Sequence, residues 1–134
     1  MKKFEILEHK ADLKIRIFGV DKEELFFNAI LAIRENQRAI ISMKDARRKI
    51  KVSSPDLPSL LIDFLSQVLY LSQVNKENYN NIKFKKLTNI RLEAEISGKK
   101  VEIFGEEIKG ATYHGLDIHQ EKDGTWQATV LFDV

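Results

Sequence analysis

The sequence predicts an α+β fold, with two amphipathic helices packed on a mostly antiparallel sheet in a single layered domain. Two stretches carry apolar residues at helical spacing, and several others alternate apolar with polar residues as a half-buried strand does. Asp123-Gly124 separates two such strands and suits a tight hairpin turn, which would make that pair antiparallel. Because helices and strands each have one apolar face, those faces must cover one another. With 134 residues and no repeat or linker, we expect residues 1–134 to form one domain.

The N-terminal region predicts two strands followed by a helix. Residues 4–18 alternate apolar and polar side chains on either side of a polar turn, so we expect two strands there. Asp21 is a suitable N-cap and Glu24 lies three residues further on, the spacing of a capping box. An apolar helical face follows, so the helix is expected to continue to about Asn36.

The next region predicts two more strands and the second helix. Residues 40–53 are expected to form a strand, a turn at 44–46 and another strand. The basic residues within 47–51 could bind phosphate, but a solvated strand face is the ordinary interpretation of such a cluster and the one we favour. Asp56 precedes Pro58 and a broad apolar stripe, which predicts a helix to about residue 74.

The remaining strands are expected in the second half of the chain. Residues 75–81 are polar and predict a loop. Residues 82–103 alternate as strands and are expected to reverse direction at Ser97-Gly98. Residues 109–134 then predict the final hairpin.

The composition excludes several kinds of site. The chain has no cysteine, so it can form neither a disulfide framework nor a thiolate zinc site. It also has no glycine-rich phosphate loop. The 22 basic and 20 acidic residues give a net charge of +2, which does not indicate a nucleic-acid-binding protein. No signal peptide and no stretch of membrane-spanning length stand out, so we expect a cytoplasmic protein without membrane contact.

Carboxylates are the remaining candidates for a functional site. Asp12 follows a polar turn, Asp63 lies off the apolar stripe of the second predicted helix, and Asp133 ends the last predicted strand. With the Val134 carboxylate they would form a site for a hard divalent cation if the fold brings them together, since such ions prefer oxygen ligands. Taken alone, Asp63 is an ordinary exposed carboxylate. His114 lies on the same face of its predicted strand as apolar residues at alternate positions, so it would ordinarily be a core histidine.

Four short blocks of sequence carry a family resemblance. They are Glu8-His9-Lys10-Ala11-Asp12, Leu60-Leu61-Ile62-Asp63-Phe64-Leu65 with the following Val68-Leu69-Tyr70-Leu71, Ile108-Lys109-Gly110-Ala111-Thr112-Tyr113-His114, and Val130-Leu131-Phe132-Asp133-Val134. In this order and at this spacing, the blocks resemble the signature of the archease family. They reach from residue 8 to residue 134, and together they are specific although each is weak alone.

The resemblance implies an accessory protein rather than an enzyme. Archeases assist the GTP-dependent RNA ligase that seals tRNA exons and repairs broken RNA. A member of the family is expected to promote guanylylation of the ligase and its multiple turnover, and to contact RNA only indirectly or weakly. Lys109, His9 and His114 match motif positions and would act in activating the partner.

The resemblance also implies a metal site. By position, Asp12 and Asp133 would bind a divalent metal ion, with Asp63 nearby and the Val134 carboxylate available. Ca²⁺ is the expected ion, with Mg²⁺ and Mn²⁺ as alternatives. These roles would explain why Asp63 lies off the apolar stripe of its helix.

The chain departs from the family pattern at three places, and two other functions compete with the first. Lys10 replaces a threonine and is expected to weaken metal affinity, Gly110 replaces an alanine, and the segment 101–109 is short.

One alternative function is a stand-alone metal-dependent nucleotide phosphohydrolase, which would need a general base and a substrate pocket as well. The other is a chaperone-like interaction module.

Overall fold

The computed structural model describes every residue except Lys10 and confirms the α+β class. Its elements, in chain order, are β1 Phe4–His9, β2 Asp12–Gly19, α1 Lys22–Asn36, β3 Ile40–Ser53, α2 Leu57–Asn75, β4 Glu77–Leu87, β5 Arg91–Ile103, β6 Gly110–Gln120 and β7 Trp126–Asp133. The strands form two sheets, one of order β1-β2-β7-β6 and one of order β3-β5-β4. Every pairing in both sheets is antiparallel.

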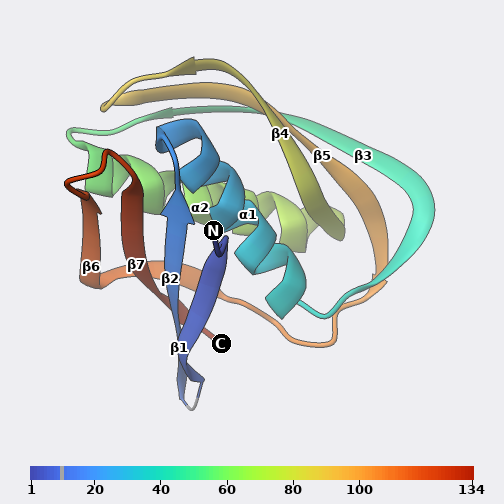
Figure 1. Cartoon of the computed structure of the whole chain (residues 1–134). Coiled ribbons are helices and arrows are strands. Elements are labelled where there is room, and N and C mark those ends of the chain that lie inside the picture. Colours follow the sequence, from blue (N-terminus) through green and yellow to red (C-terminus); the bar gives the residue numbers. More distant parts are fainter. Residues whose placement is uncertain (10) are drawn as a thin grey trace.

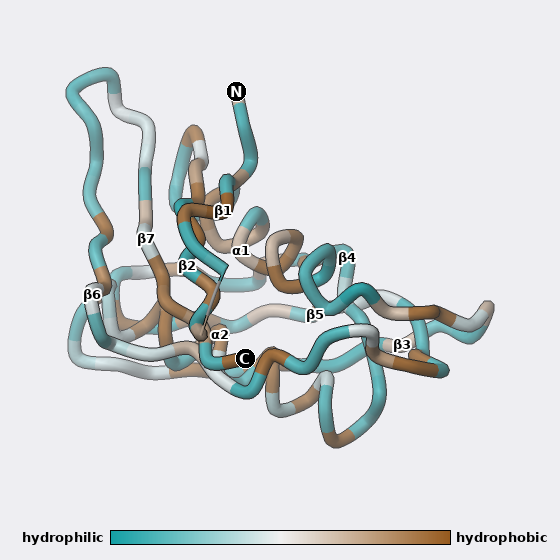
Figure 2. Tube along the Cα trace, turned by 90° about the horizontal axis from the view of Figure 1, so that it is seen from below, coloured by the Kyte–Doolittle hydropathy of each residue, from teal (hydrophilic) through white to brown (hydrophobic). Residues whose placement is uncertain are grey.

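The two helices lie between the two sheets (Figure 1). One continuous apolar core joins them, and its largest fully buried side chains come from both helices and both sheets: Leu13, Ile15, Ile17, Leu25, Phe26, Ile30, Ile50, Leu60, Leu61, Ile62, Phe64 and Phe132. Hydrophilic residues instead mark the tip of the β6–β7 hairpin (Figure 2). Each helix therefore packs against apolar side chains on two sides.

Both helices begin at the predicted caps. The Asp21 side chain accepts a hydrogen bond from the Glu24 N–H at 2.8 Å, and the Glu24 carboxylate accepts one from the Val20 N–H at 3.1 Å. The Asp56 side chain accepts in the same way from the Ser59 N–H at 2.8 Å. These bonds satisfy N–H groups that a helix start leaves without partners.

Three predictions about the strands were wrong. Residues 40–53 form one strand with an irregular register between Ile41 and Asp45, not two strands around a turn. The predicted loop at 75–81 mostly belongs to β4. Strand β5 continues through Ser97-Gly98 without turning. A Cβ on Gly98 would lie 2.0 Å from the Asn78 carbonyl oxygen, so this glycine permits a close approach of β4 rather than a turn.

Helix α2 also corrects the expectation that no stretch approaches membrane-spanning length. It has 19 residues and a mean hydropathy of 1.3, enough to cross a membrane by length and composition alone. Its apolar stripe is buried between the sheets; Leu60, Leu61, Phe64 and Leu65 are all fully covered. A helix enclosed on two sides must be apolar around much of its circumference, and this accounts for the hydropathy.

A buried carboxylate connects the two edges of the three-stranded sheet. Glu77 on β4 is 1% exposed, and both of its oxygens accept hydrogen bonds from Arg48 on β3 at 2.9 Å. Lys100 on β5 and the Tyr79 hydroxyl donate to it at 2.6 and 2.7 Å. Arg48 thus belongs to a structural network, whereas its neighbours in the basic cluster are exposed.

Candidate functional site at the ends of β2 and β7

Asp12 and Asp133 face each other across two adjacent strands. Asp12 opens β2, Asp133 ends β7, and the two are direct register partners. The next pair, Leu13 and Phe132, is fully buried in the core. Because successive side chains on a strand point to opposite faces, the two aspartates project together from the outer face of the sheet. The two predicted ligands are therefore brought together by the fold.

This pairing is electrostatically unfavourable in the protein alone. Like charges directly opposite each other destabilise a sheet. Neither carboxylate forms a salt bridge with any residue that the structure describes. Lys10 lies outside the described residues, so its expected effect on metal affinity stays a prediction. Two facing carboxylates offer the hard oxygen donors that Ca²⁺ and Mg²⁺ prefer, and a bound cation would offset their repulsion.

Val134, Lys109 and Gly110 lie beside this pair. The Val134 side chain is half-buried against the core, which fixes the end of β7. The Lys109 N–H donates to the Asp133 carbonyl oxygen at 2.8 Å, and Gly110 is the register partner of Asp133 on its other side. The Lys109 side chain is exposed. A Cβ on Gly110 would meet no atom within 4 Å, so the space available does not require glycine there.

Asp63 is not gathered with the pair. Its carboxylate accepts hydrogen bonds from the Ser54 hydroxyl at 2.6 Å and from the Tyr113 hydroxyl at 2.5 Å, one on each oxygen. Apart from Lys10, which the structure leaves undescribed, the chain contains no group of three or more His, Asp or Glu residues arranged to hold a metal. The position of Asp63 off the apolar stripe is explained by this polar link between α2 and β6.

The same link affects Tyr113. The hydrogen bond to Asp63, together with desolvation and the nearby negative charge, raises the pKa of the Tyr113 hydroxyl. No local pattern indicates that Ser54 and Tyr113 contact Asp63, because the three residues come from three separate segments.

The two motif histidines have different surroundings. His9, at the end of β1, has its Nε2 2.7 Å from the Glu106 carboxylate in the β5–β6 connection. His114 is exposed, so the interpretation as a core histidine was wrong. The register of β6 shifts between Thr112 and Asp117, so the regular alternation of inward and outward side chains, on which that interpretation depended, does not hold there. The sequence also did not reveal the pairing of His9 with Glu106.

Known proteins are similar to this chain over nearly its whole length. Residues 4–134 match the profile of the archease protein family. The chain belongs to the archease family. It is 38% identical over 148 residues to the protein archease of Methanosarcina barkeri, covering 99% of this chain and 97% of that one. It is 32% identical over 145 residues to the protein archease of Pyrococcus furiosus, covering all of both chains.

Solved structures share the archease fold. The solution structure of protein 1598 from Methanobacterium thermoautotrophicum covers all of both chains with a TM-score of 0.71 and 26% identity. The crystal structure of an archease from Thermotoga maritima, described as a possible chaperone, has a TM-score of 0.70. Its 21% identity, over 97% of this chain and 96% of that one, bears on the fold alone.

Proposed function

We propose that this archease is an accessory protein that activates a GTP-dependent tRNA-splicing and RNA-repair ligase by promoting ligase guanylylation and multiple turnover. The single observation that supports the proposal best is the pair Asp12–Asp133, held by strand pairing in a chain of this family. A sheet that aligns two carboxylates against their repulsion is a rigid place to present a cation to a partner.

In this proposal Asp12 and Asp133 hold a divalent cation, with the Val134 carboxylate as a third oxygen donor. Ca²⁺ is the expected ion, with Mg²⁺ or Mn²⁺ as alternatives, because all three accept oxygen ligands. When bound, the ion supplies positive charge that can neutralise phosphate on the partner or its nucleotide. The exposed Lys109 adds a cation beside the site, and the contact of His9 with Glu106 orients that imidazole.

Asp63 has a positioning role in the same proposal. Its hydrogen bonds to Ser54 and Tyr113 fix the β6 segment that carries His114 and, further back along the chain, Lys109. Replacement of Asp63 should therefore affect activation through the placement of this segment, without changing metal affinity as much as replacement of Asp12.

The first experiment measures ligase turnover. The GTP-dependent RNA ligase of the same organism is kept limiting, with GTP, a divalent ion and RNA ends bearing a 2′,3′-cyclic phosphate and a 5′-hydroxyl. Wild-type protein should convert single turnover into many turnovers, and Asp12→Asn and Asp133→Asn should lose this effect. Asp117→Asn removes an exposed carboxylate elsewhere on the same sheet and should retain it.

A second readout tests the metal site without the ligase. Calorimetric titration with Ca²⁺ should show binding to the wild-type protein and at least tenfold weaker binding to Asp133→Asn. No effect of wild-type protein on an active ligase would overturn the proposed function. Full activation by Asp12→Asn/Asp133→Asn would remove the metal from the mechanism and favour the chaperone-like alternative, and GTP turnover without ligase would favour the phosphohydrolase.

A further inference from the structure

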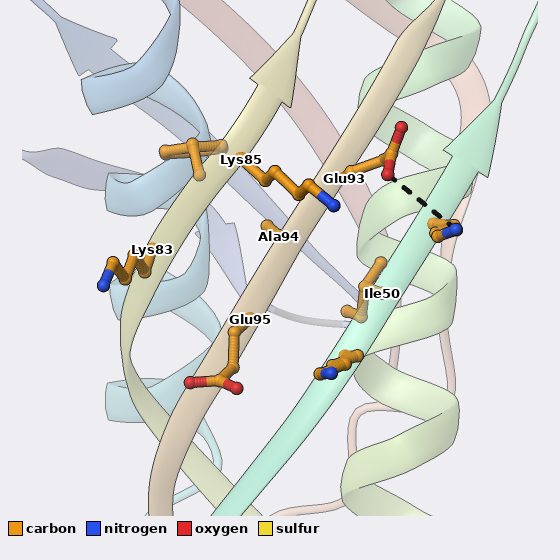
Figure 3. A pocket seen from close by; sticks show the side chains of 9 residues that line it. Ile50, Lys83, Lys85, Glu93, Ala94 and Glu95 are labelled. Carbon is orange, nitrogen blue, oxygen red and sulfur yellow. Dashed lines mark ion pairs between the residues drawn. The ribbon is translucent and has the colours of Figure 1, made fainter.

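The three-stranded sheet has an outer face lined with cations that the proposed function does not use. We call this surface the outer lysine face, and its residues are Arg47, Lys49 and Lys51 on β3, Lys83 and Lys85 on β4, and Glu93 and Glu95 on β5. The side chains of Ile50 and Ala94 are buried in the core, so their strand neighbours point outward. A groove of about 580 Å³ lies between these side chains, apart from that of Arg47. Figure 3 shows how Lys83, Lys85, Glu93 and Glu95 lie around it.

The register places the charges in rows across the sheet. Glu95 on the central strand pairs with Lys49 on one side and Lys83 on the other. Strands lie about 5 Å apart, so the cations of β3 and β4 lie on two strands about 10 Å apart, with a repeat of about 7 Å along β3. On β4 the register is irregular between Phe84 and Lys86, so Lys85 has no direct register partner on β5. The glutamates lie between β3 and β4.

The face concentrates the positive charge of the chain. Five cationic side chains and two carboxylates give it a net charge of +3, whereas the whole chain carries +2, so all other residues together carry −1. The glutamate side chains are less exposed to solvent than the cationic ones: the side chain of Glu93 is 24% exposed, while that of Lys51 is 82% exposed. An anionic partner would therefore meet the ammonium groups first.

The glutamates compensate only part of this charge. Glu95 pairs with Arg47 at 3.5 Å, and Glu93 pairs with Lys51 at 3.8 Å. Lys49, Lys83 and Lys85 are exposed and form no salt bridge with any residue that the structure describes. Three cations thus remain available for a ligand.

The residue types on this face favour a phosphate backbone over a protein partner. Protein interfaces are enriched in aromatic residues and depleted in lysine, and the outward-facing positions named above include no aromatic side chain. Single-stranded nucleic acid is usually held by base stacking on aromatic rings, and the ring of Phe84 packs toward the core. Lysine ammonium groups bind phosphate as point charges, and double-helical RNA is recognised largely through its backbone and shape.

We propose that the outer lysine face binds the phosphate backbone of double-helical RNA, weakly and without sequence preference, through its three unpaired cations Lys49, Lys83 and Lys85. The choice of RNA over DNA depends on the proposed function, whereas the charge arrangement does not. Such a contact would hold a folded RNA close to the protein while the acidic site at the ends of β2 and β7 serves the ligase.

Fluorescence anisotropy with a labelled 16-base-pair RNA duplex tests this binding in the absence of ligase. With three unpaired cations engaged, log K should fall with log salt concentration with a slope of about −2.7. The triple variant Lys49→Ala/Lys83→Ala/Lys85→Ala should bind at least tenfold more weakly at low salt, with a flatter slope. A matched variant, Lys3→Ala/Lys44→Ala/Lys122→Ala, removes three exposed lysines outside the face and should bind within about threefold of wild type.

Two results would overturn the proposal: no binding of the duplex by wild-type protein at 50 mM salt, or equal losses in the two triple variants. Tighter binding of single-stranded RNA or of an acidic peptide than of the duplex would also contradict it. Equal binding of a DNA duplex and the RNA duplex would contradict the preference for RNA and leave double-helical nucleic acid in general as the ligand. The ligase assay separates this inference from the proposed function. If RNA binding fails while wild-type protein still activates the ligase, only the outer lysine face loses its role.

Discussion

Replacement of Glu77 by glutamine tests how the buried ion-pair network stabilises the fold. Burial alone would raise the pKa of Glu77, but hydrogen bonds from Arg48, Lys100 and Tyr79 outweigh it and lower the pKa from 4.5 to about 2. A difference of about 2.5 units corresponds to about 3 kcal/mol of unfolding free energy. We therefore expect Glu77→Gln to lose about 3 kcal/mol at pH 7, comparable to breaking other buried pairs.

The sign of the pH dependence follows from the lowered pKa. Glu77 binds a proton more readily in the unfolded chain than in the folded one, so its contribution is fully present above about pH 5 and is lost as the pH falls toward 2. Urea unfolding followed by circular dichroism at several pH values measures this. The difference between wild type and Glu77→Gln should be largest near neutral pH and should vanish near pH 2.

A matched control separates burial from charge. Asp45 also pairs with a lysine, Lys99, but is 85% exposed, so Asp45→Asn should change the unfolding free energy far less than Glu77→Gln does. Equal effects of the two substitutions, or a wild-type-to-Glu77→Gln difference that does not change between pH 7 and pH 2.5, would refute the reasoning.

Three further substitutions test the packing of the fold. Gly98→Ala places a Cβ against the Asn78 carbonyl oxygen and should lower the free energy of unfolding, measured in urea, by about 3 kcal/mol or more. An unchanged free energy of unfolding would mean that β4 can move away from the new methyl group. Phe64→Ala removes a fully buried ring whose centroid lies 5.4 Å from that of Phe26, and should lower stability by about 3–5 kcal/mol, with a loss under 1 kcal/mol contradicting the assigned core. Asp21→Ala removes the α1 cap and should cost about 1 kcal/mol, whereas Asp21→Asn should restore most of it; equal losses in both would argue against capping.

The helices were predictable because their signals are local. The caps at Asp21 and Asp56 and the apolar stripes that follow them lie within one segment each, and the predicted ends agree with α1 and α2 to within one residue. That β3 and β5 are each one continuous strand was not predictable in this way. The residues at Ser97-Gly98 have the chemistry of a turn, and only the position of Asn78 shows that the glycine serves a close strand contact.

The candidate site was predictable only in part. The family resemblance pointed to Asp12 and Asp133, and the sheet makes them neighbours, but the spacing of two residues so far apart in sequence carries no distance information. For Asp63 the sequence could show only that the residue lies off the apolar stripe. Its partners, Ser54 and Tyr113, are determined by how α2 packs on β6, which is a property of the whole fold.

The position of β7 has a consequence for how the chain folds as it is synthesised. β7 is translated after the other six strands described here, yet it lies inside the four-stranded sheet, between β2 and β6. Until it leaves the ribosome, β2 has an unpaired inner edge and the core lacks the buried β7 side chains Ala128, Val130 and Phe132, a state prone to aggregation. Ribosome-bound chains that end before Trp126 should therefore be protease-sensitive in the N-terminal hairpin, and protection should arise only when β7 closes the sheet.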